Sequence, residues 1–269
     1  MSVRVVKNDV YDKNGCLLIR KGKKITDRTL NILKKHEISY EVEGLIADNN
    51  ESSNFYPYIT SFDGRKQIQD KRILERPTKV LNKILFESKT KPWWFCIKTL
   101  SNYCDLLYTH SIDVALISLI MAVELKYNNE ELFILGLGAL LHDVGRLLIP
   151  KHVTNKSENI SDSEREAFIK QHCELGVSII DGLELPKDVC DIIMQHHERL
   201  DGTGLPKGLK KEDVSLNTRI VMVADTLDDL TTYLPGEGTK SMKAAIEKLK
   251  NKTEKYPQEL ICLLEKMLN

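Results

Sequence analysis

The chain of 269 residues lacks a surplus of either charge, a long apolar run and paired cysteines. Its 39 Lys+Arg balance 39 Asp+Glu, whereas a protein that coats nucleic acid, or a polybasic membrane anchor, needs excess positive charge to offset phosphates. Residues 1–10 hold no apolar segment of a signal peptide, and the longest apolar runs, such as residues 114–123, are too short and too interrupted to cross a bilayer. We therefore expect a cytoplasmic protein with no membrane insertion and no nucleic-acid polymer as partner.

Cysteines are few and scattered. Six occur without a C-x-x-C pair, and a chain of this length needs no disulfide bonds for stability, so we interpret them as reduced thiols. Neither an internal repeat nor a low-complexity tract is present. The 42% of hydrophobic and 29% of charged residues are typical of a globular chain that buries a core, which excludes a chain disordered throughout.

The first part of the chain predicts a small α+β module. Apolar runs over residues 3–42 are short and broken by turns, and Asn14-Gly15 between two of them is typical of a β-hairpin, because both turn positions must accept positive φ. Residues 26–36 predict a helix with Thr26 as its N-cap. Residues 47–64 lack helical periodicity and are expected to be a linker. We place the domain boundary after residue 62.

From residue 63 to residue 269 the sequence predicts an all-helical domain, so the chain as a whole is mostly α. Apolar residues recur with helical spacing, and Pro92, Pro150, Pro186 and Pro206 lie at or between the helices that they would otherwise interrupt. The predicted helices span residues 66–87, 93–107, 111–125, 130–141, 163–180, 186–197, 216–233, 239–251 and 256–268.

Five of the seven histidines lie at the ends of predicted helices or on apolar helices. A single histidine in such a place is more often a hydrogen-bonded core residue than a functional group. Five together favour a shared site. They are His110, His142, His172, His196 and His197.

The pair His142-Asp143 follows an apolar helix and precedes Gly145. An imidazole and a carboxylate adjacent in sequence can point at one ion only where the helix ends or is distorted, and a glycine frees the backbone for that. Nitrogen together with oxygen ligands suits Fe, Mn or Zn rather than a closed thiolate site. The alternative is an Asp143 side chain that caps the next segment beside a core histidine.

A second motif begins at His196-His197. Adjacent histidines cannot share one helix face, so as ligands they would reach two ions or lie where the helix stops. Glu198 follows, either as a partner that orients an imidazole or as a solvated side chain. The loop Asp-Gly-Thr-Gly-Leu-Pro that starts at residue 201 lets its backbone approach a phosphate, although a plain turn between two helices has the same composition.

Asp225 lies within an apolar helical stretch, where a carboxylate is costly to bury unless it is paired or binds a metal. A salt bridge to Arg219, two turns earlier, is the alternative, but that separation is beyond the reach of neighbours on a helix. His110, at the head of the predicted helix 111–125, and His172, within the predicted helix 163–180, supply further nitrogens.

Together these motifs resemble the HD-GYP subgroup of the HD phosphohydrolases over roughly residues 100–233. The order and spacing of five separate motifs argue against chance similarity. The motifs are His110-Ser111 with Val114-Ala115, His142-Asp143, His172 with Gly176, His196-His197-Glu198 before Asp-Gly-x-Gly-x-Pro, and Arg219-Ile220 with Val223-Ala224-Asp225.

The resemblance implies an all-helical domain that hydrolyses cyclic di-GMP, to pGpG and/or GMP, by a hydroxide activated between two divalent metal ions, Fe or Mn. Asp143 would bridge the two ions and, with Arg146, act in catalysis. The substrate-binding residues would be Arg146, Gly202, Gly204, Leu205 and Arg219. The metal ligands would be His110, His142, Asp143, His172, His196, His197 and Asp225.

The sequence departs from the subgroup's pattern where substrate is expected to bind. Members usually carry lysine at Arg146, tyrosine at Leu205 and an arginine-rich stretch at residues 233–236. A glutamate that accompanies a third metal in some members would fall at Leu106, which cannot ligate, so we expect two metals.

Three functions therefore stay open. The complete ligand set favours a cyclic-dinucleotide phosphodiesterase, since seven polar groups are costly to keep together without a metal. The altered loop at Leu205 favours a metal-dependent phosphohydrolase that acts on another nucleotide. The third is a catalytically weak cyclic-dinucleotide sensor or interaction module, in which the N-terminal module or a homodimer is the working part.

Overall fold

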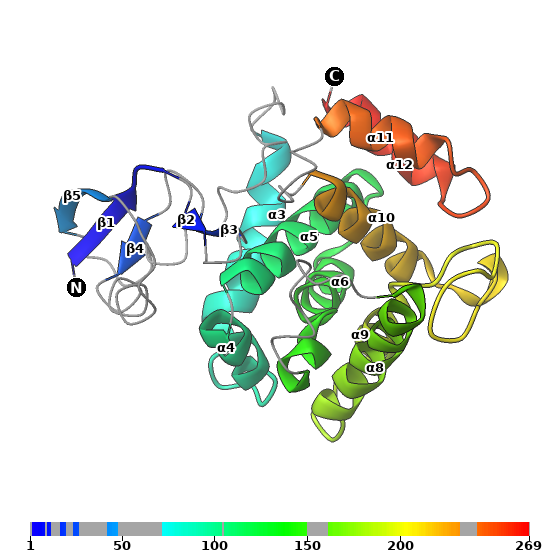
Figure 1. Cartoon of the computed structure of the whole chain (residues 1–269), viewed down its shortest axis with the longest axis horizontal. Helices are drawn as coiled ribbons and strands as arrows, with labels where there is room; N and C mark the ends of the chain where they lie inside the picture. The colour runs from blue at the N-terminus through cyan, green and yellow to red at the C-terminus, as the bar shows by residue number, and fades with distance from the viewer. Residues whose placement is uncertain are drawn as a thin grey trace.

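The structure of the protein, a computed structural model, combines a small N-terminal part built of strands with a larger part built of helices (Figure 1). The residues that the structure describes are 2–8, 10–11, 17–19, 24–26, 42–47, 72–103, 105–149, 161–231 and 241–268.

The N-terminal strands pair in two antiparallel sheets. The central strand β1 (Ser2–Val6) pairs with β4 (Lys24–Thr26) on one side and with β5 (Val42–Ala47) on the other. Strand β2 (Val10–Tyr11) pairs with β3 (Leu17–Ile19), which confirms the predicted hairpin, although its Asn-Gly turn lies outside the described residues. The predicted helix 26–36, the linker 47–64 and the domain boundary also lie outside them, apart from the residues that end β4 and β5.

The remaining described chain is helical, as the periodicity predicts. Most of its helices end within a few residues of the predicted limits. Short π-helical (η2) and 3₁₀ (η3, η4) turns lie between the α-helices. The elements are α3 (Arg72–Asn82), η2 (Lys83–Glu87), α4 (Trp94–Tyr103), α5 (Asp105–Glu124), α6 (Asn129–Leu141), η3 (Val144–Leu148), α8 (Asp162–Ile180), α9 (Lys187–Gln195), η4 (Lys211–Asp213), α10 (Leu216–Thr231), α11 (Met242–Lys250) and α12 (Gln258–Leu268).

One helix boundary is wrong in the sequence prediction. The expected break between residues 107 and 111 does not exist, because α5 runs without interruption from Asp105, so His110 lies inside a helix rather than at its head. Ser111 is the first residue of the predicted helix, but its hydroxyl donates a hydrogen bond to the carbonyl oxygen of Leu107, one turn earlier, at 3.0 Å. A serine that bonds back in this way fits a helix interior.

Helix α5 is the centre of the helical part, where it packs against α3, α6 and α10 (Figure 1). Every side chain over residues 111–122 is buried. Among the described residues, α5 is the one helix long and apolar enough to cross a membrane, over Leu107–Glu124, but 78% of that window is buried inside the protein. Such burial is typical of the central helix of a globular domain.

Close packing of α6 on α9 brings two site histidines together. A Cβ atom at Gly138 would lie 2.5 Å from Cδ1 of Ile192, so a larger residue there would push the two helices apart. Helix α6 ends next to His142 and α9 ends next to His196, and the two imidazole centroids lie 4.9 Å apart. The helix packing therefore decides how near these two rings lie.

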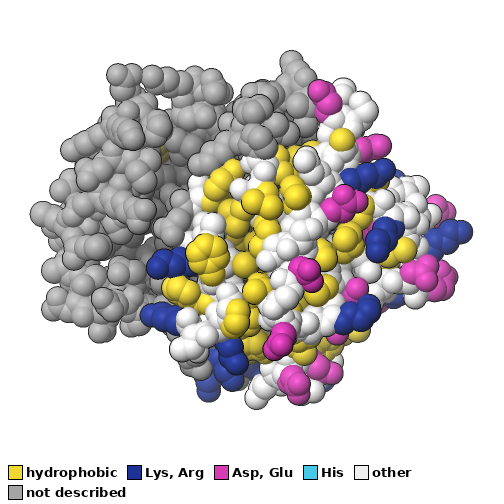
Figure 2. Space-filling model, turned by 90° about the horizontal axis from the view of Figure 1, so that it is seen from below, with side chains coloured by type: hydrophobic (Ala, Val, Ile, Leu, Met, Phe, Trp, Pro, Cys, Tyr) yellow, Lys and Arg dark blue, Asp and Glu magenta, His cyan; other side chains and the backbone are white. Residues whose placement is uncertain are grey.

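The surface carries both signs of charge. On the face shown in Figure 2, hydrophobic side chains gather across the middle, with acidic and basic side chains interspersed around them. Among the residues that the structure describes, the two most exposed large apolar side chains are Phe95 of α4 at 71% and Leu148 of η3 at 59%. The mixture of signs agrees with the net charge of zero.

Candidate metal centre

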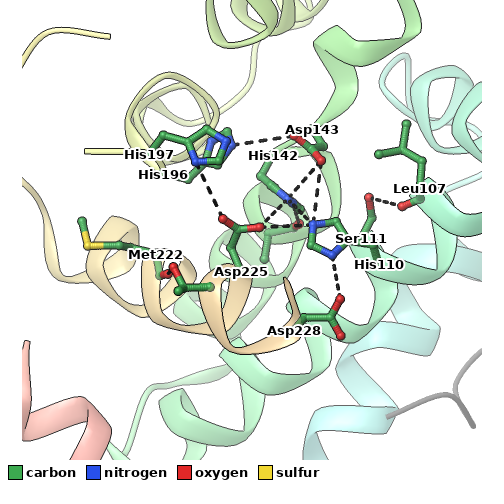
Figure 3. A network of polar contacts seen from close by, with 12 residues as sticks. Leu107, His110, Ser111, His142, Asp143, His196, His197, Met222, Asp225 and Asp228 are labelled. Atoms are coloured by element: carbon green, nitrogen blue, oxygen red, sulfur yellow. Dashed lines mark hydrogen bonds and ion pairs between the residues drawn. The ribbon is translucent and has the colours of Figure 1, made fainter. Parts of the chain in front are cut away.

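Five imidazoles and two carboxylates converge inside the helical part. Figure 3 shows both carboxylates and four of the imidazoles, those of His110, His142, His196 and His197. The seven side chains come from α5, α8 and α10 and from the ends of α6 and α9. Five separate segments of the chain therefore meet at this point. The structure thus brings together all seven residues that the sequence predicts as ligands, and their role as ligands stays a prediction. They are His110, His142, Asp143, His172, His196, His197 and Asp225.

The end of α6 lets His142 and Asp143 face the same point. His142 keeps helical angles (φ −51°, ψ −37°), whereas Asp143 leaves them (φ −99°, ψ 13°). The Asp143 side chain makes no capping hydrogen bond to η3, so the alternative of a capping aspartate is wrong. At Gly145 a Cβ atom would lie 1.9 Å from the carbonyl oxygen of His172, so glycine is needed for η3 to lie against α8.

Hydrogen bonds at Nδ1 orient four of the imidazoles. A backbone carbonyl only accepts, so an Nδ1 atom beside one must carry the proton, which leaves Nε2 with a free lone pair in the neutral ring. This is the tautomer of a histidine that binds a metal through Nε2. The Nδ1 contacts are His142 to Ala139 O at 2.7 Å, His172 to Phe168 O at 3.1 Å, His196 to Ile192 O at 3.1 Å and His110 to Asp228 Oδ2 at 2.7 Å.

The Nε2 atoms then face one another in pairs. Those of His172 and His196 lie 3.4 Å apart, and those of His110 and His142 lie 3.2 Å apart. Because the Nδ1 atoms of His172 and His196 both bond to carbonyls, their two Nε2 lone pairs meet without a proton between them. A cation between such nitrogens satisfies both, so the donor set fits a metal.

Asp143 lies between two groups of imidazoles. Its Oδ1 is 3.3 Å from Nε2 of His172 and 3.8 Å from Nε2 of His196. Its Oδ2 is 3.8 Å from Nε2 of His110 and 3.7 Å from Nε2 of His142. Each oxygen of one carboxylate therefore serves a different group, which is the arrangement of a bridging ligand.

Asp225 approaches the same two groups from α10. Its Oδ1 lies 3.2 Å from Nε2 of His110 and 3.6 Å from Nε2 of His142, and its Oδ2 lies 3.9 Å from Nδ1 of His197. His197 follows the end of α9, and its side chain is less buried than that of His196. The neighbouring histidines do lie where the helix stops, as the sequence indicates.

Burial keeps most of these imidazoles neutral. Burial, together with the nearby His142 and His172, lowers the pKa of His196 to about 3. Burial likewise lowers the pKa of His172 and lowers that of His197 well below its usual range. Neutral imidazole is the form that binds metal, so these shifts favour ligation.

The pKa of His110 is raised, whereas the pKa values of Asp143 and Asp225 are lowered. Burial lowers the pKa of His110, but Asp225 and Asp228 outweigh burial and raise that pKa well above its usual range. Burial raises the pKa of Asp143, but Arg146 and the imidazoles hold it well below the usual range, and the imidazoles of His110 and His142 do the same for the pKa of Asp225. Both carboxylates are therefore ionised and able to ligate.

Arg146 contacts the centre directly. Its Nη1 donates to Oδ2 of Asp143 at 2.7 Å, its guanidinium lies 5.3 Å from the ring centroid of Phe168, and its side chain is 21% exposed. This salt bridge is not a surface one, because the partner carboxylate is 3% exposed and belongs to the cluster. Its catalytic and substrate-binding roles stay predictions.

The loop after His197 lies against the centre through its backbone. The amide of Leu205 donates to the carbonyl oxygen of His197 at 3.1 Å, and a Cβ atom at Gly204 would lie 2.1 Å from the amide nitrogen of Arg199. Both interpretations of Glu198 are wrong. Its side chain is fully buried, and it accepts hydrogen bonds from backbone amides of the loop rather than orienting an imidazole.

Arg219 is held by the backbone at the start of α10. Its Nε donates to the carbonyl oxygen of Val214 at 2.9 Å, and its Nη2 donates to that of Lys211. It forms no ion pair with Asp225, which agrees with the distance argument from the sequence. A substrate-binding role for Arg219 stays a prediction.

Asp228 is a residue of the centre that the sequence analysis missed. It is 6% exposed and contacts Nδ1 of His110. The available signal was its position three residues after Asp225, on the same helix face.

Comparisons with known proteins agree with this geometry. The chain is 33% identical to a cyclic di-GMP phosphodiesterase of Pseudomonas aeruginosa over 140 residues, which cover 52% of this chain and 33% of that protein. It is 33% identical to a 3'3'-cGAMP-specific phosphodiesterase of Vibrio cholerae over 135 residues, which cover 50% of this chain and 31% of that protein. The chain thus spans about a third of the length of each of these relatives.

A solved structure shares the fold over nearly the whole chain. It is an HDG"Y"P protein from Bdellovibrio bacteriovorus, with a TM-score of 0.56 and 22% identity, over 98% of this chain and 95% of that one. A model of the HD domain family matches residues 95–260, which contain all seven cluster residues. The chain therefore belongs to the HD domain family.

Proposed function

We propose that this protein is a metal-dependent phosphodiesterase that hydrolyses cyclic dinucleotides, cyclic di-GMP first among them. The observation that carries the proposal is the position of Asp143, whose two oxygens face two separate groups of imidazoles. The first group with Asp143 is His110 and His142, and the second is His172, His196 and His197. Two donor groups joined by one carboxylate suit two metal ions rather than one.

The residues themselves favour Fe or Mn. Five imidazoles with two carboxylates and no thiolate form a mixed nitrogen and oxygen donor set, which suits these ions. When bound, two such ions acidify a water between them and stabilise negative charge on phosphoryl oxygens. The nearby Cys173 is not needed as a ligand, because burial raises its pKa and keeps it a thiol.

The chain's own groups orient and neutralise the substrate. Arg146 shares Oδ2 of Asp143 and places a planar cation at the edge of the centre, where it can donate two parallel hydrogen bonds to a phosphate. A lysine, usual at this position, would offer a compact point charge instead. Arg146 thus preserves the charge but changes the geometry of phosphate recognition.

A second substrate is favoured by one observation. Leu205 replaces a tyrosine in the loop that lies on His197, and the relative from Vibrio cholerae is specific for 3'3'-cGAMP. Leucine can pack against a base but cannot donate a hydrogen bond to it. We therefore keep another cyclic dinucleotide as the second candidate substrate. A cytoplasmic location and a homodimer stay predictions.

The test is hydrolysis by the metal-loaded protein. The protein is incubated with cyclic di-GMP, cyclic GMP-AMP, linear pGpG and mononucleotides, and binding and products are both measured. The proposal requires slow conversion of cyclic di-GMP to pGpG or GMP. Tight binding without turnover by fully metallated protein would instead support a sensor, and faster turnover of a mononucleotide would exclude the cyclic-dinucleotide class.

A further inference from the structure

We propose that Glu198 is a positioning residue that holds the loop formed by residues 201–210 against the metal centre. This inference rests on the proposed function, because it takes that loop to be the part of the site that meets the substrate. Glu198 has no contact with the reacting atoms in this scheme. It acts through the loop.

The carboxylate of Glu198 is buried and bonded on both oxygens. Its side chain is 0% exposed, Oε1 accepts from the amide of Lys207 at 2.7 Å, and Oε2 accepts from the amide of Leu209 at 2.9 Å. Among the described residues, no Lys or Arg side chain lies within 4.0 Å of this carboxylate. Burial of a charge without a counter-ion is costly, so these two charge-assisted hydrogen bonds are strong local constraints on the loop.

A β-bridge joins the two ends of the loop, and Glu198 attaches its second half to the protein interior. Asp201 and Lys210 form an isolated β-bridge, which joins the two ends. Oδ1 of Asp201 accepts from the amide of Thr203 at 3.0 Å, and Gly202 and Gly208 adopt positive φ of 79° and 65°. The second half of the loop, which contains Lys207 and Leu209, is held inward by Glu198.

The middle of the loop lies on the backbone that carries the ligand His197. The amide of Leu205 donates to the carbonyl oxygen of His197 at 3.1 Å. At Gly204 a Cβ atom would lie 2.3 Å from Cα of Glu198, so this contact admits only glycine. Glu198 therefore determines how Leu205 is presented beside the metal centre.

The backbone of Glu198 is held independently of its side chain. Nη1 of Arg199 donates to the carbonyl oxygen of Glu198 at 2.7 Å, and the guanidinium of Arg199 lies 5.0 Å from the ring centroid of Tyr256. The amide of Leu200 donates to the carbonyl oxygen of Lys255 at 3.1 Å. When the carboxylate is removed, we therefore expect the loop to loosen while the backbone near His197 stays in place.

The test compares three variants of the full chain. Glu198→Gln keeps the shape, but its NH₂ group faces one of the two backbone amides and leaves it without an acceptor. Glu198→Asp keeps the charge, but it is one methylene shorter and cannot reach both amides. Glu212→Gln, at an exposed position of η4 directly after the loop, is the matched control for the change in charge.

Three quantities are measured on each variant: amide hydrogen exchange of peptides spanning residues 201–210, bound metal, and the kinetics of cyclic di-GMP hydrolysis. We expect both Glu198 variants to speed exchange in this peptide and to raise KM about tenfold or more, with bound metal unchanged and kcat changed less than KM. Glu212→Gln should match the unmodified protein in all three.

Other results would overturn the proposal. Unchanged exchange in both Glu198 variants would show that the carboxylate does not hold the loop. Loss of metal would assign Glu198 to support of the ligands, and faster exchange with unchanged KM would separate the loop from substrate binding. If the unmodified protein cleaves no cyclic dinucleotide, the proposed function fails, whereas hydrogen exchange still decides whether Glu198 holds the loop.

Discussion

Asp228 and His110 are joined by a 2.7 Å contact between Oδ2 of the aspartate and Nδ1 of the imidazole (Figure 3). On the other side of the ring, Nε2 of His110 faces Asp225 at 3.2 Å. One face of α10 thus supplies both carboxylates that contact this histidine, and Asp228 orients the ring so that Nε2 points into the cluster.

The first prediction concerns this pair. Asp228→Ala should lower metal affinity about 10–100-fold, because the imidazole of His110 loses the acceptor that fixes its orientation. Asp228→Asn should lower it less, since the amide oxygen still accepts from Nδ1. Metal titration measures both effects. Asp181→Ala, at an exposed position, is the control, and unchanged affinity in Asp228→Ala would contradict the orienting role.

The second prediction concerns Asp143. Asp143→Ala should abolish hydrolysis, because the carboxylate that faces both groups of imidazoles is gone. The helical fold should survive, although stability falls if bound metal supports folding. Turnover and circular dichroism are compared with those of Asp213→Ala, an exposed change. Turnover equal to that of the unmodified protein would eliminate the bridging role.

The third prediction concerns metal content. The purified protein should carry about two Fe or Mn ions per chain, as expected of a centre with two donor groups. Cys173→Ala should keep them. Its Sγ lies 3.7 Å from Nε2 of His172, but burial keeps the thiol protonated. Metal analysis that finds no ion even after anaerobic reconstitution would exclude the enzyme hypothesis.

The fourth prediction concerns Leu205. Leu205→Tyr should improve hydrolysis of cyclic di-GMP, because a phenol restores one polar contact worth about 0.5–1.5 kcal/mol net. Leu205→Phe is the matched control, since it adds the ring without the hydroxyl. The ratio kcat/KM should rise for Tyr more than for Phe. Equal values for all three side chains would show that this position does not touch the substrate.

The fifth prediction concerns the pH dependence of the metal-free protein. The folded pKa of His196 is about 3, below the usual 6.5, so its neutral form stabilises the fold fully above pH 6.5, and this contribution is lost as pH falls from there toward 3. His172 and His197 act in the same direction. One such imidazole changes the free energy of unfolding by about 1.4 kcal/mol per pH unit at most.

His110 has the opposite sign in the metal-free protein. Its raised pKa contributes stability below pH 6.5 that is lost as the pH rises through the folded pKa. Stability should therefore be greatest near pH 6 to 7. Thermal unfolding of chelator-treated protein between pH 4.5 and 9 measures this, and a midpoint that is the same at pH 5 and pH 7 would contradict the assignment of neutral, buried imidazoles.

Local sequence determines the helical class and the members of the cluster. Apolar spacing predicts the helices, and the pair His142-Asp143 before a glycine indicates a helix end, which the structure places there. The other motifs of the resemblance to the HD-GYP subgroup indicate the other five cluster residues. These signals are short in range, because helix periodicity and helix ends depend on residues only a few positions apart.

Tertiary structure alone decides what the polar residues contact. The sequence predicts that a helix begins at Ser111, yet burial of α5 on three neighbouring helices keeps the helix continuous through His110. Glu198 follows two ligand residues, yet its carboxylate bonds amides nine and eleven residues later. The partner of Asp228 lies 118 residues away in the chain. No local sequence pattern predicts contacts between residues so far apart in the chain. These contacts form only when the helices pack, because a buried carboxylate is stable only where a hydrogen-bond donor is within reach.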